Sequence, residues 1–238
     1  MRPDINILVM RKVNSFIRIL LLLLVIAVSN GQAQERYELP DGTMLDGVKR
    51  LNGALPNDTL TILGLTLDRS NFADVRSILG PTANLPRTND PHEADIICYA
   101  AANDPTIRLS FAAGWPENAK VTPTSFTLFI GKLLSLKGSC TPSAKLTMKT
   151  TTANGLGLGL TQSNLTSILG TPSKIMPHWI IYSFAAYREY SKSERQKMPG
   201  APGGGEYKGE YTYHNLVAHF THGKMDLLSV SVGGETDW

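Results

Sequence analysis

Two short stretches of the chain share one pattern of hydrophobic and polar positions. Each begins at a residue whose side-chain oxygen can cap a helix, Asn71 or Thr161. Each ends at a glycine, Gly80 or Gly170, with a proline just beyond, which is how a short helix is terminated. Between these bounds the apolar residues follow helical spacing: Phe72, Val75, Ile78 and Leu79 in the first stretch, and Leu165, Ile168 and Leu169 in the second. The sequence therefore predicts the same short helix twice.

Each predicted helix is followed by three segments rich in β-forming residues, which predict strands. They are 94–100, 106–112 and 125–130 after the first helix, and 179–184, 216–221 and 227–232 after the second. In the aligned copies Tyr182 falls on Tyr99, and Phe220 falls on Phe111. A helix followed by an antiparallel meander predicts the α+β class. We expect two tandem units, each with a short helical segment and a three- to four-stranded antiparallel sheet: a first repeat unit at 58–135, a connector at 136–153 and a second unit at 154–238.

The first 33 residues have the order of a secretory signal peptide. Basic residues precede an unbroken apolar run at 19–28, and small or polar residues follow it up to Ala33. The run is shorter than the roughly 20 apolar residues that a spanning helix needs. We therefore assign 1–33 to a cleaved signal peptide and 34–57 to a polar N-terminal lead-in; an uncleaved membrane anchor starting near Ile5 is the alternative.

Removal of this segment changes the charge of the chain. The whole sequence has 23 Lys and Arg against 20 Asp and Glu. The predicted signal peptide carries four basic residues, Arg2, Arg11, Lys12 and Arg18, and one acid, Asp4, so the rest of the chain is neutral. A neutral domain has no general electrostatic attraction for nucleic acid, and we expect no nucleic-acid partner. Contact with a membrane is expected only through the signal segment, if it is not cleaved.

The two cysteines, Cys98 and Cys140, predict a disulfide because the chain is expected to be exported. The bridge would close a loop of about 42 residues and, in the chain-entropy treatment, would stabilise the fold by roughly 4 kcal/mol. A redox or metal-binding pair is the alternative, but it lacks C-x-x-C spacing and nearby ligands. We expect the protein in the periplasm or outside the cell.

The sequence shows no catalytic constellation, and we expect no cofactor and no metal. The Gly-Leu repeat at 155–159 lacks the G-x-G-x-x-G spacing of a nucleotide-binding loop. Three histidines, His214, His219 and His222, suggest a metal-dependent or hydrolytic envelope enzyme, which we keep as an alternative function. Strand neighbours on one face lie two residues apart, so His219 and His222 would point to opposite faces unless a turn intervenes.

Tyrosines gather around the longest insertion between predicted strands, a Gly/Pro-rich loop at 187–211 of the second unit. Aromatic-rich loops are common binding surfaces. The alternative is a solvated hairpin tip whose tyrosines only flank the strands. We take Trp179, Tyr182, Tyr187 and Tyr190 as the candidate contact residues of a binding surface.

The second unit also carries a run of short structural motifs. They are Gly159-Leu160-Thr161, Ile168-Leu169-Gly170-Thr171-Pro172, Tyr182, Gly223-Lys224 and a final strand at 227–232. This run resembles the SmpA/OmlA (BamE) family of bacterial envelope proteins. A tandem pair of such units also resembles the β-lactamase inhibitory protein-like fold, in which an open concave sheet face grips a partner protein. The resemblance covers most of 59–232 and implies a binding function without naming the partner.

Together these observations predict an exported, non-enzymatic protein-binding module of the bacterial cell envelope. We expect it to use an antiparallel sheet face, and its partner to be an unidentified envelope or extracellular protein. The alternatives are the enzyme built on the three histidines and a structural component of envelope assembly.

Overall fold

The computed structural model describes residues 36–37, 47–85, 95–113, 122–133, 136, 138–198 and 205–237. The predicted signal peptide at 1–33 and much of the lead-in lie outside the described residues, as does the Gly/Pro-rich segment at 199–204. The chain divides into two compact units, Met1–Arg36 and Tyr37–Trp238. The architecture described below is that of the second unit.

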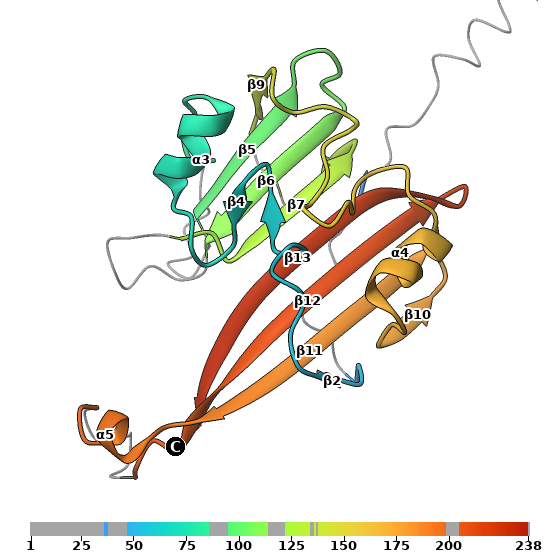
Figure 1. Cartoon of the computed structure of the whole chain (residues 1–238). Helices are drawn as coiled ribbons and strands as arrows, with labels where there is room; N and C mark the ends of the chain where they lie inside the picture. The colour runs from blue at the N-terminus through green and yellow to red at the C-terminus, as the bar shows by residue number, and fades with distance from the viewer. Residues whose placement is uncertain are drawn as a thin grey trace, which may run out of the picture. The chain divides into compact units, whose positions relative to one another are not determined.

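A nine-stranded sheet dominates this unit, in the order β10-β11-β12-β13-β7-β6-β5-β9, with β2 pairing β11 beside this path (Figure 1). Neighbouring strands are antiparallel except β9 on β5 and β2 on β11, which are parallel. The strands of the sheet are β2 (Leu51–Asn52), β5 (Asp95–Ala101), β6 (Ile107–Ala113), β7 (Ser125–Ile130), β9 (Thr141–Ser143), β10 (Lys174–Met176), β11 (Trp179–Glu189), β12 (Gly209–Thr221) and β13 (Lys224–Asp237). The short strands outside it are β1 (Arg36–Tyr37), β3 (Thr61–Ile62), β4 (Leu65–Thr66) and β8 (Lys132–Leu133).

The prediction of α+β tandem units is wrong, because the described residues are mostly β, with 45% strand and 12% helix. Strands from both predicted units join one sheet through the antiparallel pairing of β13 with β7, from Leu227 on Phe129 to Ser231 on Ser125. Two separate meanders would each leave an edge strand with unpaired backbone groups, and their pairing removes both edges. The described residues contain three helices, α3 (Phe72–Leu79), α4 (Gln162–Leu169) and α5 (Lys192–Arg195).

The two predicted helices are nonetheless present, with the predicted ends. The side chains of Asn71 and Thr161 each accept a hydrogen bond from the backbone N–H three residues later. The side chain at that later position accepts in turn from the backbone N–H of the cap residue, and the two bonds form a capping box. Both helices end at a glycine with positive φ, 106° at Gly80 and 78° at Gly170. The local helix signals therefore predicted these elements correctly, although the arrangement of the sheet was not predicted.

A tyrosine anchors each of these helices to the sheet in the same way. The hydroxyl of Tyr99 on β5 donates to the Gly80 carbonyl at 2.8 Å, and the hydroxyl of Tyr182 on β11 donates to the Gly170 carbonyl at 2.9 Å. Both tyrosine side chains are fully buried. The predicted alignment of Tyr182 with Tyr99 is thus confirmed by equivalent contacts, which we call the tyrosine anchors.

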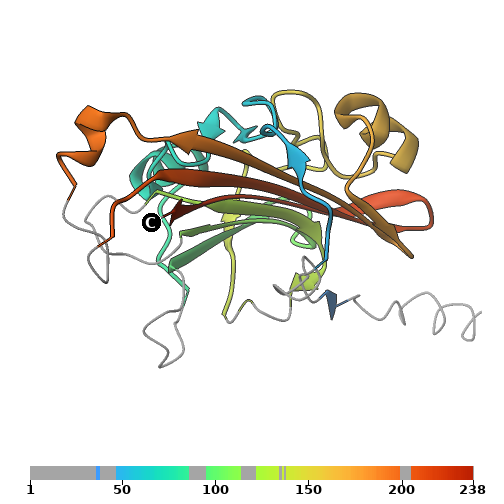
Figure 2. The same ribbon diagram turned by 90° about the horizontal axis from the view of Figure 1, so that it is seen from below.

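Both helices and the β3–β4 hairpin lie on one face of the sheet, which we call the inner face (Figure 2). Alternate strand positions point to this face and pack against the apolar sides of the helices. The largest core cluster combines these groups and includes Phe72, Val75, Leu79, Leu165, Tyr99, Leu109, Phe126, Leu128, Tyr182, Leu216, Phe220 and Val230. The Gly-Leu repeat contributes Leu156 and Leu158 to the same core, so this segment packs against the sheet.

The predicted disulfide between Cys98 and Cys140 is present, with 4.6 Å between the two Cα atoms. Cys98 lies on β5, and Cys140 directly precedes β9, whose Thr141 pairs with Tyr99. The bridge therefore fastens the edge strand β9 to its neighbour. A disulfide indicates an oxidising compartment outside the cytoplasm.

Among the described residues, no helix has the length and apolar character needed to cross a membrane.

Candidate functional site

The strands β12 and β13 continue beyond the rest of the sheet. β13 pairs with β7 only from Leu227 to Ser231, whereas its pairing with β12 continues to Asp237 (Figure 1). β11 follows β12 to the pair of Glu189 with Gly209. The loop is therefore shorter than the predicted 187–211, because both ends of that range are strand. Its charged part forms the short helix α5. We call this extension of three strands the distal end of the sheet.

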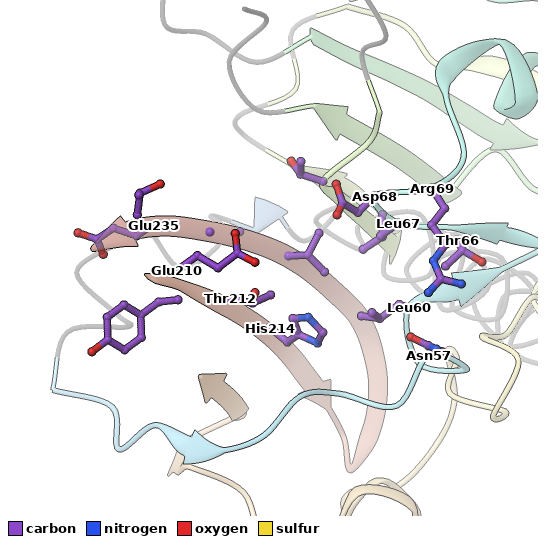
Figure 3. Close-up of a pocket in the computed structure, with 16 residues that line it drawn as sticks. Asn57, Leu60, Thr66, Leu67, Asp68, Arg69, Glu210, Thr212, His214 and Glu235 are labelled. Carbon is purple, nitrogen blue, oxygen red and sulfur yellow. The ribbon is translucent and has the colours of Figure 1, made fainter. Parts of the chain in front are cut away.

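A cleft of about 500 Å³ opens on the inner face at the distal end (Figure 3). Glu210, Thr212 and His214 lie in a row along β12 and face a segment that carries Asp68 and Arg69 (Figure 3). The remaining lining residues are Asn57, Leu60, Thr66, Leu67, Thr124, Tyr211, Val232, Gly233, Gly234, Glu235 and Thr236. Most of these residues are polar, so the cleft is suited to a polar group rather than to an apolar ligand.

His214 joins the N-terminal segment to the sheet at one end of this cleft. Its Nδ1 accepts a hydrogen bond from the Leu55 backbone N–H at 3.1 Å, so Nδ1 is unprotonated and the neutral ring carries its proton on Nε2. Burial lowers the pKa of His214, while the carboxylate of Asp68 acts in the opposite direction. His214 is therefore neutral at pH 7 and has a structural contact.

Glu210 belongs to a charged network that holds the distal end together. Its carboxylate accepts from Arg188 Nε at 2.9 Å and from the Tyr190 hydroxyl at 3.1 Å. Arg188 also donates to Glu194 of α5 at 2.7 Å. The hydrogen bonds from Arg188 and then from Ser191 lower the pKa of Glu194 to about 2. The network fixes α5 against the ends of β11 and β12.

The outer face of the distal end carries three tyrosines in contact, Tyr187, Tyr211 and Tyr213, which we call the tyrosine ladder. The ring centroids of Tyr187 and Tyr211 are 4.7 Å apart, and Tyr211 stacks on Tyr213 with 3° between the ring planes. Tyr187 and Tyr211 are 46% and 38% exposed. The guanidinium of Arg50 lies over the Tyr213 ring, 4.4 Å from its centroid. The ladder is thus an accessible aromatic surface on paired strands.

Two carboxylates border the tyrosine ladder. Glu235 accepts from the Tyr213 hydroxyl at 3.1 Å, and Asp237 accepts from the Tyr187 hydroxyl at 3.2 Å. Desolvation and these acceptor carboxylates raise the pKa of Tyr187 and of Tyr213, so both hydroxyls stay protonated at neutral pH. A second cavity of about 220 Å³ lies beside them, lined by Tyr211, Glu235, Thr236 and Asp237.

The centre of the outer face is less accessible than its distal end. Ser183 and Thr127 are each 4% exposed there. Ser183 donates to Asn215 at 2.8 Å, and Thr127 and Ser229 share a hydrogen bond at 3.0 Å. These small polar side chains bond to one another. Among the described residues, the exposed aromatic side chains, Tyr187 and Tyr211, lie at the distal end of this face.

The four predicted contact residues do not form one surface. Tyr182 is fully buried as a tyrosine anchor, so its assignment as a contact residue is corrected. Tyr190 is 6% exposed and donates to Glu210, and Trp179 packs against a small apolar cluster with Phe129 and Leu227. Only Tyr187 of the four belongs to the tyrosine ladder.

The other two ladder residues, Tyr211 and Tyr213, were not among the predicted contact residues. Their spacing of two residues places both rings on one strand face. The missing information was the strand register, which sets Tyr187 directly opposite Tyr211.

The three histidines of the enzyme alternative are separated. His219 lies next to Asp226, with 2.7 Å between Nδ1 and Oδ1, and its ring contacts Trp179. His222 lies in the β12–β13 turn with a φ of 51°, and His214 lies in the inner cleft. Within the part of the chain that the structure describes, no group of three or more His, Cys, Asp or Glu residues is arranged to hold a metal ion.

No protein-family model, curated protein or solved structure matches this chain. The resemblance to the SmpA/OmlA (BamE) family and to the β-lactamase inhibitory protein-like fold therefore stays a prediction.

Proposed function

We propose that this chain is an exported, non-enzymatic protein-binding module of the bacterial cell envelope, located in the periplasm or secreted. It holds a partner protein at the distal end of its sheet. The observation that carries the proposal is the tyrosine ladder, in which two exposed rings, Tyr187 and Tyr211, stand side by side on paired strands. The disulfide supports export because it requires an oxidising compartment.

Exposed tyrosines on strands are suited to protein recognition for two reasons. A tyrosine offers a large contact area and a hydroxyl but has few rotatable bonds, so little entropy is lost on binding. The ladder is also held in place before binding, because Tyr187 is bonded to Asp237 and Tyr213 to Glu235. Preorganised contacts of this kind reduce the cost of association.

The test compares partner capture by the wild-type protein and by ladder variants. The tagged protein is cross-linked in the envelope of its source cells, and proteins that co-purify are identified and measured for affinity. The double variant Tyr187→Thr/Tyr211→Thr removes both exposed rings and keeps β-forming residues. Ile175→Thr is the matched control, because Ile175 is 65% exposed on the far strand β10.

We expect the double variant to bind the captured partner at least about 30-fold more weakly, since interface hot spots contribute about 2 kcal/mol or more. The control should bind within about twofold of wild type, which is a change of less than about 0.5 kcal/mol. Equal affinity of the double variant and the control would overturn the proposal. So would the absence of any partner that is enriched over a tag-only capture.

A further inference from the structure

The tyrosine ladder already binds one cation from within the chain. Arg50, directly before β2, places its guanidinium 4.4 Å from the centroid of the Tyr213 ring. The pairing of Leu51 with Phe184 brings this arginine to the ladder. Guanidinium groups stack on aromatic faces because the electron-rich face attracts the positive charge. One ring of the ladder therefore shows which chemical group this surface accepts.

The ring of Tyr211, next to Tyr213, has the same orientation but different neighbouring groups. Tyr211 lies parallel to Tyr213, with 6.1 Å between their centroids, and it is 38% exposed. It borders the cavity of about 220 Å³ whose other lining residues are Glu235, Thr236 and Asp237. No arginine or lysine is among the described residues that line this cavity. Tyr211 thus presents the exposed part of its ring, flanked by Tyr187 and Tyr213, next to two acidic side chains.

Within the described residues, each carboxylate has one oxygen that its bond to a tyrosine does not use. Glu235 uses Oε2 to accept from Tyr213, and Asp237 uses Oδ2 to accept from Tyr187, so Oε1 and Oδ1 are not used in these bonds. Neither carboxylate forms an ion pair with a described residue. The bond from the Lys208 backbone N–H goes to the backbone carbonyl of Asp237, not to its carboxylate. An aromatic face flanked by carboxylate oxygens is complementary to a planar guanidinium, which can stack and donate hydrogen bonds at once.

We propose that the partner protein seats an arginine side chain in this cavity, with its guanidinium on the Tyr211 ring and its N–H groups directed at Glu235 and Asp237. This inference rests on the proposed function and specifies the chemistry of the partner. The site selects arginine over lysine, because an ammonium group is compact and cannot stack on the ring while donating in two directions in one plane.

The test uses small probes and the purified full chain, so it needs no knowledge of the partner. Nα-acetyl-arginine amide, the corresponding lysine amide and the neutral citrulline amide are titrated at equal ionic strength, and the amide and aromatic NMR signals are followed. We expect the arginine probe to shift signals of 209–213 and 233–237. We expect shifts at least about threefold smaller with the lysine probe and none at these positions with citrulline, because the guanidinium carries the recognition.

Variants assign the shifts to the cavity. Tyr211→Leu should abolish the arginine-dependent shifts, whereas Tyr211→Phe keeps the aromatic face and should retain them, which also controls for folding. Glu235→Gln should reduce them, and Ile175→Thr should leave them unchanged. Equal shifts with arginine and citrulline, or arginine shifts that survive Tyr211→Leu, would overturn the inference.

Failure of this inference is distinguishable from failure of the proposed function. If the arginine probe causes no shifts at the ladder while the double ladder variant still loses the captured partner, the surface binds protein by other contacts. If the arginine probe binds as expected but no partner is enriched, the cation site stands and the proposed function fails.

Discussion

Removal of the two anchor hydroxyls should weaken the fold by a predictable amount. Tyr99→Phe and Tyr182→Phe each delete one hydrogen bond, of 2.8 and 2.9 Å, and leave the buried ring in place. The net contribution of one such bond is about 1 kcal/mol. Gly80 is half-buried and Gly170 is exposed, so water can replace the lost donor more easily at Gly170. We therefore expect Tyr99→Phe to cost somewhat more than Tyr182→Phe.

The two anchors share no bonding partner, so their effects should add to about 2 kcal/mol in the double variant. Burial raises the pKa of Tyr182 to about 12, so this hydroxyl remains a donor across the working pH range. Urea denaturation of the oxidised protein measures the free energy of unfolding, and a loss of 2 kcal/mol moves the midpoint by about 1 M at an m-value of about 2 kcal/mol/M. The control Tyr213→Phe removes a hydroxyl that bonds to exposed Glu235 and should cost less than about 0.5 kcal/mol. Losses below about 0.3 kcal/mol in both single variants would refute the anchoring role.

Three further predictions concern the disulfide and two titrating groups. Replacing Cys98 and Cys140, 42 residues apart, by serine should lower the free energy of unfolding by about 4 kcal/mol in urea titrations, and a loss below about 1 kcal/mol would contradict this. The pKa of Glu194 is lowered from 4.5 to about 2, so its stabilisation is complete above pH 4.5 and is lost as the pH falls toward 2. Carboxyl NMR should show this pKa rising toward 4.5 in Arg188→Gln, and an unchanged value would exclude the ion pair as its cause. The pKa of His214 is lowered from 6.5, so the neutral ring stabilises the fold above pH 6.5. This stabilisation is lost as the pH falls through the lowered pKa. As the pH falls, hydrogen exchange of the Leu55 backbone amide should then accelerate beyond its intrinsic pH dependence. Protection of this amide that persists after His214 is protonated would argue against its hydrogen bond to His214.

Local signals in the sequence predicted the elements correctly wherever neighbouring residues determine the structure. The helices α3 and α4 were predicted from Asn71, Thr161 and the two terminal glycines, because caps and glycine stops act within one turn. The disulfide followed from the presence of two cysteines in a chain expected to be exported. The strands after each helix followed from β-forming residues. Those after α3 lie within one residue of their predicted bounds, whereas β11, β12 and β13 are longer than predicted.

The sheet order could not be predicted because it depends on contacts between distant residues. The pairing of Ser125 with Ser231 joins segments that carry no mutual signal in one sequence. The tyrosine ladder required the same kind of information, since Tyr187 and Tyr211 meet only through the register of β11 on β12. Tyr182 was misassigned because a tyrosine in a β-forming run is compatible with either face until that register is known.

The proposed function requires that the exposed rings of the distal end contact the partner protein. Hydroxyl-radical footprinting of the captured complex measures this directly, because oxidation of a side chain reports its exposure to solvent. We expect oxidation of Tyr187 and Tyr211 to fall on partner binding while oxidation of Ile175 on β10 stays constant. Unchanged oxidation of both tyrosines in the complex would contradict it.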